Sequence, residues 1–279
     1  MTVFLRRMFR RRSAILGLVL LLGVVVLALT ASRFWPDDPF DMVASPLLAP
    51  GEDPDFLLGS DNLGRDMGAA VAYGARVSLL VGLASALTAT LIGVGIGAIA
   101  GYFGGWVDDV LMRLTEIFQT IPPFLFAIVL VAILSPTVWT IVTALTVVSW
   151  PPLARLARAE VMALRDREFV LSCVAFGMSD ARIILLQILP NAAPPLIVAA
   201  TITAASAILA EAGLSFLGLG DPNVMSWGTM IGLGRDLIRT APWVVTVPGI
   251  AVLLTVLGLN LVGEGLNDAL NPRLRERSA

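Results

Sequence analysis

Six apolar segments, separated by polar stretches, dominate this chain of 279 residues. A helix of about 20 apolar residues crosses the hydrocarbon core of a bilayer, which is about 30 Å thick. Hydrophobic residues make up 57% of the sequence and charged residues only 14%, which excludes an ordinary soluble domain. We therefore predict an all-α membrane protein with six transmembrane helices. The expected spans cover residues 14–31, 79–101, 121–135, 137–151, 194–213 and 244–262.

The third and fourth segments are short for a bilayer and are bounded by prolines. Pro122-Pro123 lie at the start of the third, Ser135-Pro136 separate the two, and Pro151-Pro152 follow the fourth. Because proline interrupts a helix, we interpret this region as a tight hairpin of two spans. The alternative is one broken, re-entrant hairpin that does not cross the membrane fully.

Arginine supplies all 19 basic residues, and its distribution predicts the orientation of the chain. With the N-terminus in the cytosol, 14 arginines lie in cytosolic segments and 5 in external ones, as expected from the bias of positive residues towards the inside. We therefore expect both termini in the cytosol. A basic N-terminus before an apolar run is also typical of a signal peptide, but a run of about 18 residues favours an uncleaved anchor.

This orientation divides the chain into five parts. They are a basic cytosolic N-terminus (1–13), a first span (14–31), an external loop (32–78), a five-span core (79–262) with a cytosolic loop at 152–193, and a cytosolic tail (263–279). Within the core, residues 104–121 have the pattern of an amphipathic helix, which we expect to lie at the membrane interface.

The chain has no histidine and no lysine, and this excludes several kinds of site. A Walker-type phosphate loop requires lysine. Histidine metal sites, Ser-His-Asp triads and lysine Schiff bases are excluded in the same way. Cys173 is the single cysteine and can form no disulfide within the chain. We therefore expect no catalytic residue and no metal site in this chain. We also expect that the chain itself holds no cofactor and has no nucleic-acid partner.

The spans themselves are rich in small residues. Gly93, Gly97 and Gly101 form a small-xxx-small row that permits close helix packing. Glu211 is the one charged candidate at membrane depth, near the outer end of the fifth span. The polar candidates for a translocation path, each of which we expect to serve helix packing instead, are Thr143, Thr146, Thr201, Thr203 and Ser206.

The cytosolic stretch 169–191 has the pattern of two short helices joined at Gly177. Glycine supplies the backbone freedom for a turn, Ser179-Asp180 are typical of a helix N-cap, and Pro190 ends the segment. We predict that this folded loop is a docking element, with apolar residues facing a partner and arginines at the rim. The apolar candidates are Val170, Val174, Phe176 and Ile183, and the basic ones are Arg155, Arg158, Arg165, Arg167 and Arg182. The alternative is that the apolar face packs on the bundle and the arginines only reflect orientation.

Residues 169–191 resemble the EAA loop of the permeases of binding-protein-dependent ABC importers. The matching positions are Gly177, Ser179, Asp180, Arg182, Ile183, Leu189, Pro190 and Asn191. The family's Glu-Ala-Ala is replaced here by Leu171-Ser172-Cys173. We therefore expect any coupling to occur through shape and apolar contact around Gly177, not through a salt bridge from that glutamate.

Three further stretches are similar to motifs of the dipeptide/oligopeptide/nickel permeases, in the shorter of their two paired subunits. The first external motif matches residues 58–66, which include Gly64, Arg65 and Asp66, and residues 74–79. The second external motif matches 211–220, which begin with Glu211, and 226–228, which include Trp227. The C-terminal signature matches 265–275.

The resemblance implies a type I ABC importer permease fold in the inner membrane of a bacterium. It also implies a second homologous permease, two ATP-binding subunits that bind ATP and Mg, and an extracytoplasmic solute-binding protein. The acidic external loop, with Asp37, Asp38 and Asp41, is expected to be solvated or part of a platform for that binding protein. We expect Glu211 to be a structural staple paired with Arg65, Arg76 or Arg235.

The expected cargo is a di- or oligopeptide. Nickel or another small solute of the same family is the alternative, although the chain has no histidine to bind a metal. Two rival functions are an ATP-independent secondary transporter or channel, which would require charges or broken helices forming an ion site in the membrane, and a membrane scaffold without a transport role.

Overall fold

A computed structural model describes residues 11–270, which are almost entirely helical. Most of the predicted basic N-terminus and the last residues of the predicted C-terminal signature lie outside this range. The helices are α2 (Arg12–Phe34), α3 (Met67–Phe103), α4 (Gly105–Gln119), α5 (Pro123–Leu134), α6 (Val138–Arg165), α7 (Glu168–Ala175), α8 (Asp180–Ile183), α9 (Leu189–Leu214), α10 (Trp227–Gly234) and α11 (Trp243–Leu270). Two π-helical turns, η1 (Ile184–Ile188) and η2 (Ser215–Leu219), flank α9, and a 3₁₀ turn, η3 (Arg235–Leu237), follows α10.

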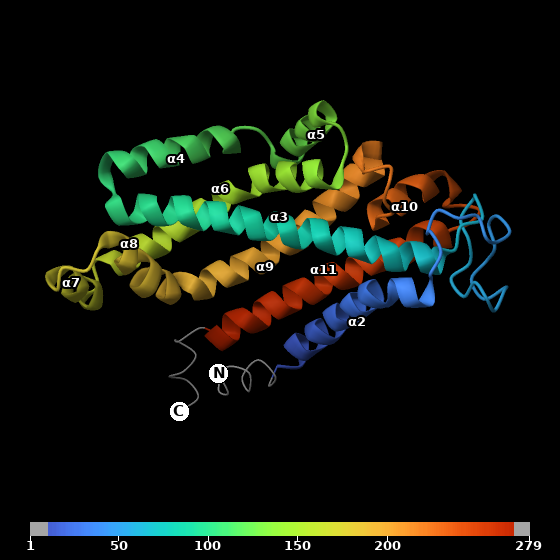
Figure 1. Cartoon of the computed structure of the whole chain (residues 1–279), viewed down its shortest axis with the longest axis horizontal. Helices are drawn as coiled ribbons and strands as arrows, with labels where there is room; N and C mark the ends of the chain where they lie inside the picture. Colours follow the sequence, from blue (N-terminus) through green and yellow to red (C-terminus); the bar gives the residue numbers. More distant parts are fainter. Residues whose placement is uncertain (1–10, 271–279) are drawn as a thin grey trace.

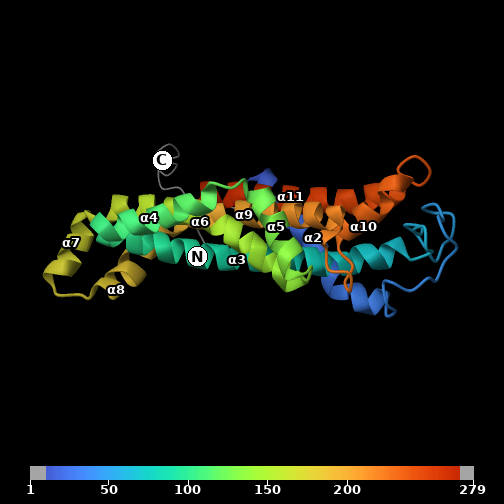
Figure 2. The same ribbon diagram turned by 90° about the horizontal axis from the view of Figure 1, so that it is seen from above.

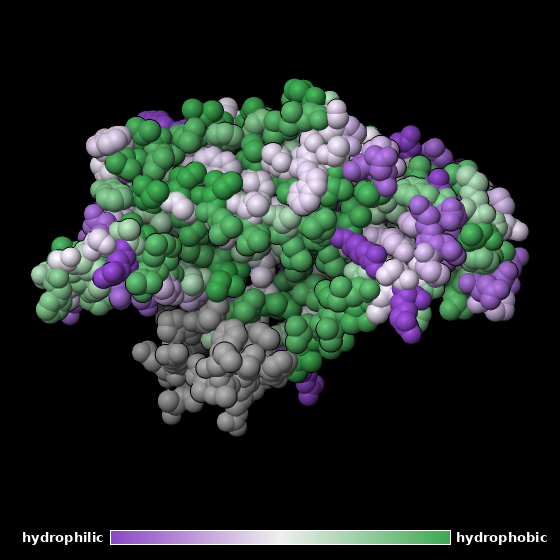
Figure 3. All heavy atoms as spheres, viewed as in Figure 1, coloured by the Kyte–Doolittle hydropathy of each residue, from purple (hydrophilic) through white to green (hydrophobic). Residues whose placement is uncertain are grey.

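The long helices form one elongated bundle (Figures 1 and 2). Within residues 11–270, five helices are long and apolar enough to cross a membrane, and a sixth crossing is obtained if α4 and α5 count as one span bent by 79°. Apolar side chains cover much of the middle of the face seen in Figure 3, while polar residues gather at the end opposite α7. Such a band is the surface expected of a protein immersed in lipid.

The structure corrects the prediction for the third and fourth spans. Helix α5 has only 12 residues, too few to cross a bilayer by itself. Helix α6 continues through Pro151 and Pro152 to Arg165, so the expected interruption of the helix at these prolines is wrong. Packing against neighbouring helices allows a membrane helix to tolerate such interruptions. Helix α3 likewise begins at Met67 and not at residue 79.

Helix α4 is part of the bundle, which contradicts the prediction of a separate interfacial helix. Figure 1 shows it lying along α3. The ring of Phe118 contacts that of Trp150 in α6, with 5.3 Å between their centres. The carboxylate of Asp108 forms an ion pair with Arg158 of α6. Aromatic and charged contacts therefore fix α4 to α6 along its length.

The closest helix packing is between α3 and α6. A side chain at Gly97 would overlap the carbonyl oxygen of Ala154, and one at Gly93 would come within 2.7 Å of the carbonyl oxygen of Trp150. At Gly101 the Arg158 carbonyl oxygen lies equally close, at 2.7 Å. The glycine row predicted from the sequence therefore forms an interface within the chain, where only glycine permits this backbone approach.

Candidate functional site

Residues 166–188 form an elbow that projects from one end of the bundle (Figures 1 and 2). It consists of α7, a turn at Gly177, α8 and η1. The elbow lies between the two long helices α6 and α9 in the chain. It overlaps residues 169–191, the segment predicted to dock a partner. We call this end of the molecule the elbow end and the opposite end the cap end.

Buried apolar residues fasten the elbow to the bundle. Val170 is 1% exposed and Ile183 is fully buried, and both pack in one cluster with Ala98 of α3 and Val161 of α6. The prediction that Val170 and Ile183 offer an apolar face to a partner is therefore wrong. They hold the elbow in place because their side chains point towards the bundle.

A second set of apolar residues on the elbow faces away from the bundle. Phe176 is 90% exposed, Leu171 is 55% exposed and Val174 is 52% exposed. Scattered apolar side chains are normal on a surface, but a cluster next to charged residues marks a contact site. Val174 and Phe176 are two of the residues predicted to dock a partner, and Leu171 lies at the position where the family motif has glutamate.

The backbone turn of the elbow depends on Gly177. Its φ of +74° lies in the left-handed region, where a β-carbon is unfavourable. A side chain there would meet no atom within 4 Å, so the requirement comes from the backbone angle alone. The amide of Gly177 donates to the Val174 carbonyl oxygen (2.9 Å) and that of Met178 to the Cys173 carbonyl oxygen (3.0 Å), which close the end of α7.

The polar residues of the elbow differ in their contacts. Ser179 occupies the N-cap position of α8, but its side chain makes no capping hydrogen bond. Asp180 accepts a hydrogen bond from the Tyr102 hydroxyl. Arg182 is exposed. Glu168, which sequence reasoning missed, is an exposed acidic residue at the first position of α7, one turn before Leu171.

Two of the arginines predicted to contact a partner at the rim of the elbow form contacts within the helix bundle instead. Arg158 pairs with Asp108, and Arg165 donates from Nη1 to the carbonyl oxygen of Gly101 at the end of α3 (3.1 Å). The other three arginines predicted for the rim, Arg155, Arg167 and Arg182, are exposed. The rim prediction therefore remains open for these three alone.

At the cap end, the first external motif folds into a tight turn before α3. The carbonyl oxygen of Gly64 accepts hydrogen bonds from the amides of Val43 and Ala44, each 3.0 Å long. The guanidinium of Arg65 lies over the ring of Phe40, 5.1 Å from its centre. The Asp66 carboxylate caps α3 by accepting from the amide of Gly68 (2.7 Å).

Glu211 is held at the cap end by hydroxyl groups. It is 1% exposed, and its two carboxylate oxygens accept hydrogen bonds from Ser78 of α3 (3.1 Å) and Ser215 of η2 (2.8 Å). Within residues 11–270 no arginine forms an ion pair with it, so the predicted pairing is wrong. The expected stapling role agrees with the geometry, because three elements meet at this carboxylate.

Trp227 joins the second external motif to α3. Its side chain is fully buried, and its indole N–H donates to the carbonyl oxygen of Val71 (3.0 Å). Gly74 lies against the ring, since a β-carbon there would be 3.0 Å from Cδ1. The two external motifs are therefore packed together, although 156 positions separate Trp227 from Val71.

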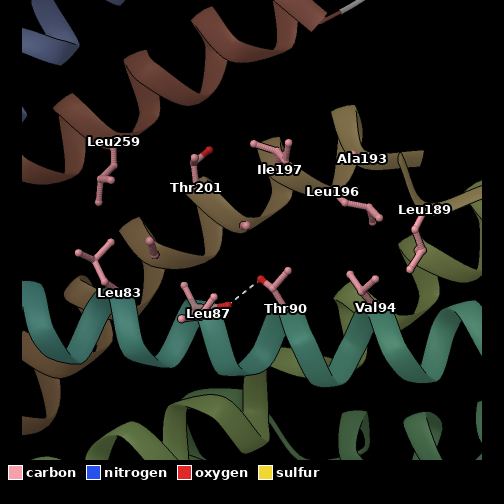
Figure 4. A pocket seen from close by; sticks show the side chains of 13 residues that line it. Leu83, Leu87, Thr90, Val94, Leu189, Ala193, Leu196, Ile197, Thr201 and Leu259 are labelled. Carbon is pink, nitrogen blue, oxygen red and sulfur yellow. Dashed lines mark hydrogen bonds between the residues drawn. The ribbon is translucent and has the colours of Figure 1, made fainter. Parts of the chain in front are cut away.

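An apolar groove of about 440 Å³ lies between α3, α9 and α11. Figure 4 shows Leu83, Leu87 and Leu259 around it, with Thr201 also on its wall. The Thr90 hydroxyl donates to the Ala86 carbonyl oxygen and that of Thr201 to the Val198 carbonyl oxygen, so neither has a hydrogen left to donate to a solute. The groove therefore presents an almost wholly apolar surface.

The other threonines proposed for a translocation path also form hydrogen bonds within the bundle. The hydroxyls of Thr143 and Thr203 bond to their own helices, and Thr146 bonds to Thr88 of α3. Ser206 is exposed. Within residues 11–270, no group of three His, Cys, Asp or Glu side chains is arranged to hold a metal ion.

Comparison with known proteins accounts for this arrangement. Residues 93–276 match the family described as "Binding-protein-dependent transport system inner membrane component". The chain is 38% identical over 276 residues to the dipeptide transport system permease protein DppC of Alkalihalophilus pseudofirmus, covering 97% of this chain and 89% of the relative. It is 42% identical over 270 residues to the di/tripeptide transport system permease protein DppC of Pseudomonas aeruginosa, covering 95% and 89%.

A solved structure shares the fold. An inward-facing structure of the MetNI methionine ABC transporter aligns with a TM-score of 0.61 and 20% identity, over 72% of this chain and 96% of that chain. The expected type I ABC importer permease fold is thereby confirmed. The chain therefore belongs to the family of binding-protein-dependent transport system inner membrane components.

Proposed function

We propose that this chain is one of two homologous permease subunits of an ATP-driven importer of di- or oligopeptides. Its partners are a second permease, two ATP-binding subunits and an extracytoplasmic solute-binding protein, in a bacterial inner membrane with both termini in the cytosol. ATP and Mg are bound by the partner subunits, since a chain without lysine has no Walker-type phosphate loop. The names of the relatives as dipeptide and di/tripeptide permeases support this cargo.

The elbow is the observation that supports coupling to an ATPase most directly. It combines exposed apolar residues, Phe176 above all, with buried anchors that tie it to α3 and α6. Because the elbow is anchored in this way, a partner that binds Phe176 and moves the elbow also moves α3 and α6. ATP binding drives transport through such a contact only if the partner binds the two states of the permease with different affinity.

Co-purification tests the docking step. The substitution Phe176→Ala should weaken retention of the ATP-binding subunits about thirtyfold, the effect of losing a binding hot spot of about 2 kcal/mol. Phe34→Ala is the matched control, because Phe34 is 69% exposed but belongs to α2. Equal retention of the ATP-binding subunits by the two variants would contradict docking at the elbow.

Uptake into proteoliposomes tests the cargo. The reconstituted complex should accumulate a radiolabelled Ala-Ala dipeptide only with ATP and the solute-binding protein present. Nickel uptake in place of peptide uptake would support the other cargo of the same family. Accumulation by this chain alone in ATP-free liposomes would contradict the importer.

A further inference from the structure

The end of α3 nearest the elbow is joined to it by polar contacts as well as by the apolar cluster. The Tyr102 hydroxyl donates a hydrogen bond of 2.8 Å to Oδ1 of Asp180, the first residue of α8. Arg165, the last residue of α6, donates from Nη1 to the carbonyl oxygens of Gly101 (3.1 Å) and Tyr102 (3.5 Å). The elbow, through Asp180, and the end of α6, through Arg165, are therefore both held on Gly101 and Tyr102 of α3.

From this attachment α3 runs to the cap end without an interior proline. Its 37 residues correspond to about 55 Å of helix. The other long helices of the core contain interior prolines, at positions 151 and 152 in α6, 194 and 195 in α9, and 248 in α11. An interior proline removes a backbone hydrogen bond and is a common site of bending. Helix α3 therefore lacks the cause of bending that the other long core helices contain.

The cap is built on the first turns of the same helix. Val71 and Ser78 of α3 bond to Trp227 and Glu211, respectively. These contacts tie α10 and the end of α9 to α3. A displacement of Gly101 and Tyr102 therefore reaches the cap through one uninterrupted helix.

We propose that Tyr102 is a positioning residue that fastens the elbow to α3, and that α3 carries movement of the elbow to the cap end. This inference rests on the proposed function, because the movement is supplied by the ATP-binding subunits. A hydroxyl that donates to a carboxylate forms a charge-assisted hydrogen bond, which holds α8 on α3 while leaving Phe176 free for the partner.

The test uses the whole complex in proteoliposomes, with uptake of radiolabelled Ala-Ala and ATP hydrolysis measured together. Tyr102→Phe deletes only the hydroxyl, and peptide uptake per ATP hydrolysed should fall about threefold, as expected for losing one exposed hydrogen bond. Asp180→Asn keeps an acceptor oxygen without the charge and should have a smaller effect. The matched control is Tyr73→Phe, which removes the hydroxyl that donates to the Trp35 carbonyl oxygen near the other end of α3, and its uptake per ATP should equal that of the wild type.

Two results would overturn the inference. One is an unchanged ratio of uptake to ATP hydrolysis in Tyr102→Phe. The other is a fall in both rates with an unchanged ratio and a lower melting temperature, since that shows a role in stability alone. A wild-type complex without ATP-dependent peptide uptake contradicts the proposed function instead, which keeps the two failures distinguishable.

Discussion

The two ends of the bundle use similar residues in opposite ways. At the cap end, Trp227 is buried with its N–H bonded, and the Ser226 hydroxyl accepts from the amide of Thr229 as a helix cap. At the elbow end, Phe176 stands in solvent and the N-cap residue Ser179 makes no capping bond. In both comparisons the cap residue finds its partner within the chain and the elbow residue does not. The cap is therefore suited to be a rigid part, and the elbow to be completed by a partner.

The largest effect is expected for Trp227→Ala at the cap. Loss of a buried tryptophan should lower the free energy of unfolding by about 3–5 kcal/mol, measured by denaturation of the purified protein in detergent. Trp106→Ala is the control, because Trp106 is 76% exposed. Equal loss of unfolding free energy in the two variants would show that Trp227 stabilises the fold no more than an exposed tryptophan does, and would contradict a rigidly packed cap.

A smaller loss of stability is expected for Glu211→Gln. The amide has one acceptor oxygen where the carboxylate has two, so one of the Ser78 and Ser215 hydroxyls loses its acceptor. The free energy of unfolding should fall by about 1–3 kcal/mol, the cost of an unsatisfied buried polar group. Glu116→Gln, which breaks a pair with Arg113 that is exposed on both sides, should change it by less than about 1 kcal/mol.

At the elbow, Gly177→Val should impair coupling more than stability. A side chain in the left-handed region costs about 1–2 kcal/mol locally, which favours a different path of the turn and displaces Phe176. We expect weaker retention of the ATP-binding subunits at a nearly unchanged melting temperature. The control is Gly249→Val in α11, where a side chain also meets no atom within 4 Å but φ is not positive. A large fall in melting temperature for Gly177→Val but not for Gly249→Val would contradict this prediction. It would show that the turn at Gly177 stabilises the whole fold, as the cap does.

The smallest effects on stability are expected for substitutions of Ser226 and Ser179, the two serines at helix N-cap positions. Ser226→Ala should cost about 1 kcal/mol of stability, since it removes a real capping bond. Ser179→Ala should leave the unfolding free energy unchanged because there is no such bond to lose. Thermal unfolding of the two variants side by side checks this difference, and the reverse order would contradict it.

Residue pattern was enough to predict the helical membrane fold, the elbow and its turn at Gly177. Apolar length determines which segments can enter a bilayer, and few residues other than glycine accept a positive φ. The pattern failed at Pro151-Pro152, because neighbouring helices decide whether a membrane helix continues past proline. It also failed at Val170, since the eight-residue helix α7 has apolar residues on more than one side and the bundle selects which side is buried.

Contacts between residues far apart in the chain could not be predicted from the sequence for a different reason. Tyr102 and Asp180 lie 78 positions apart, and Ser78 and Glu211 lie 133 apart. A charged residue near the end of a span suggests an ion pair, so arginine was the expected partner of Glu211. Only the packed structure shows that the hydroxyls of Ser78 and Ser215, and not an arginine, contact the Glu211 carboxylate.

If α3 transmits movement between the two ends, it must behave as a rigid rod. The most direct test measures the distance between spin labels placed at Leu80 and Ile99, two exposed positions on α3, in the complex carrying Cys173→Ser. The labelled positions lie about 28 Å apart along the helix. This distance should be the same with and without ATP, while a label pair at Leu186 and Ile202, on either side of the prolines in α9, should change. A change with ATP in the α3 distance, with the α9 distance constant, would show that α3 bends and does not transmit the movement.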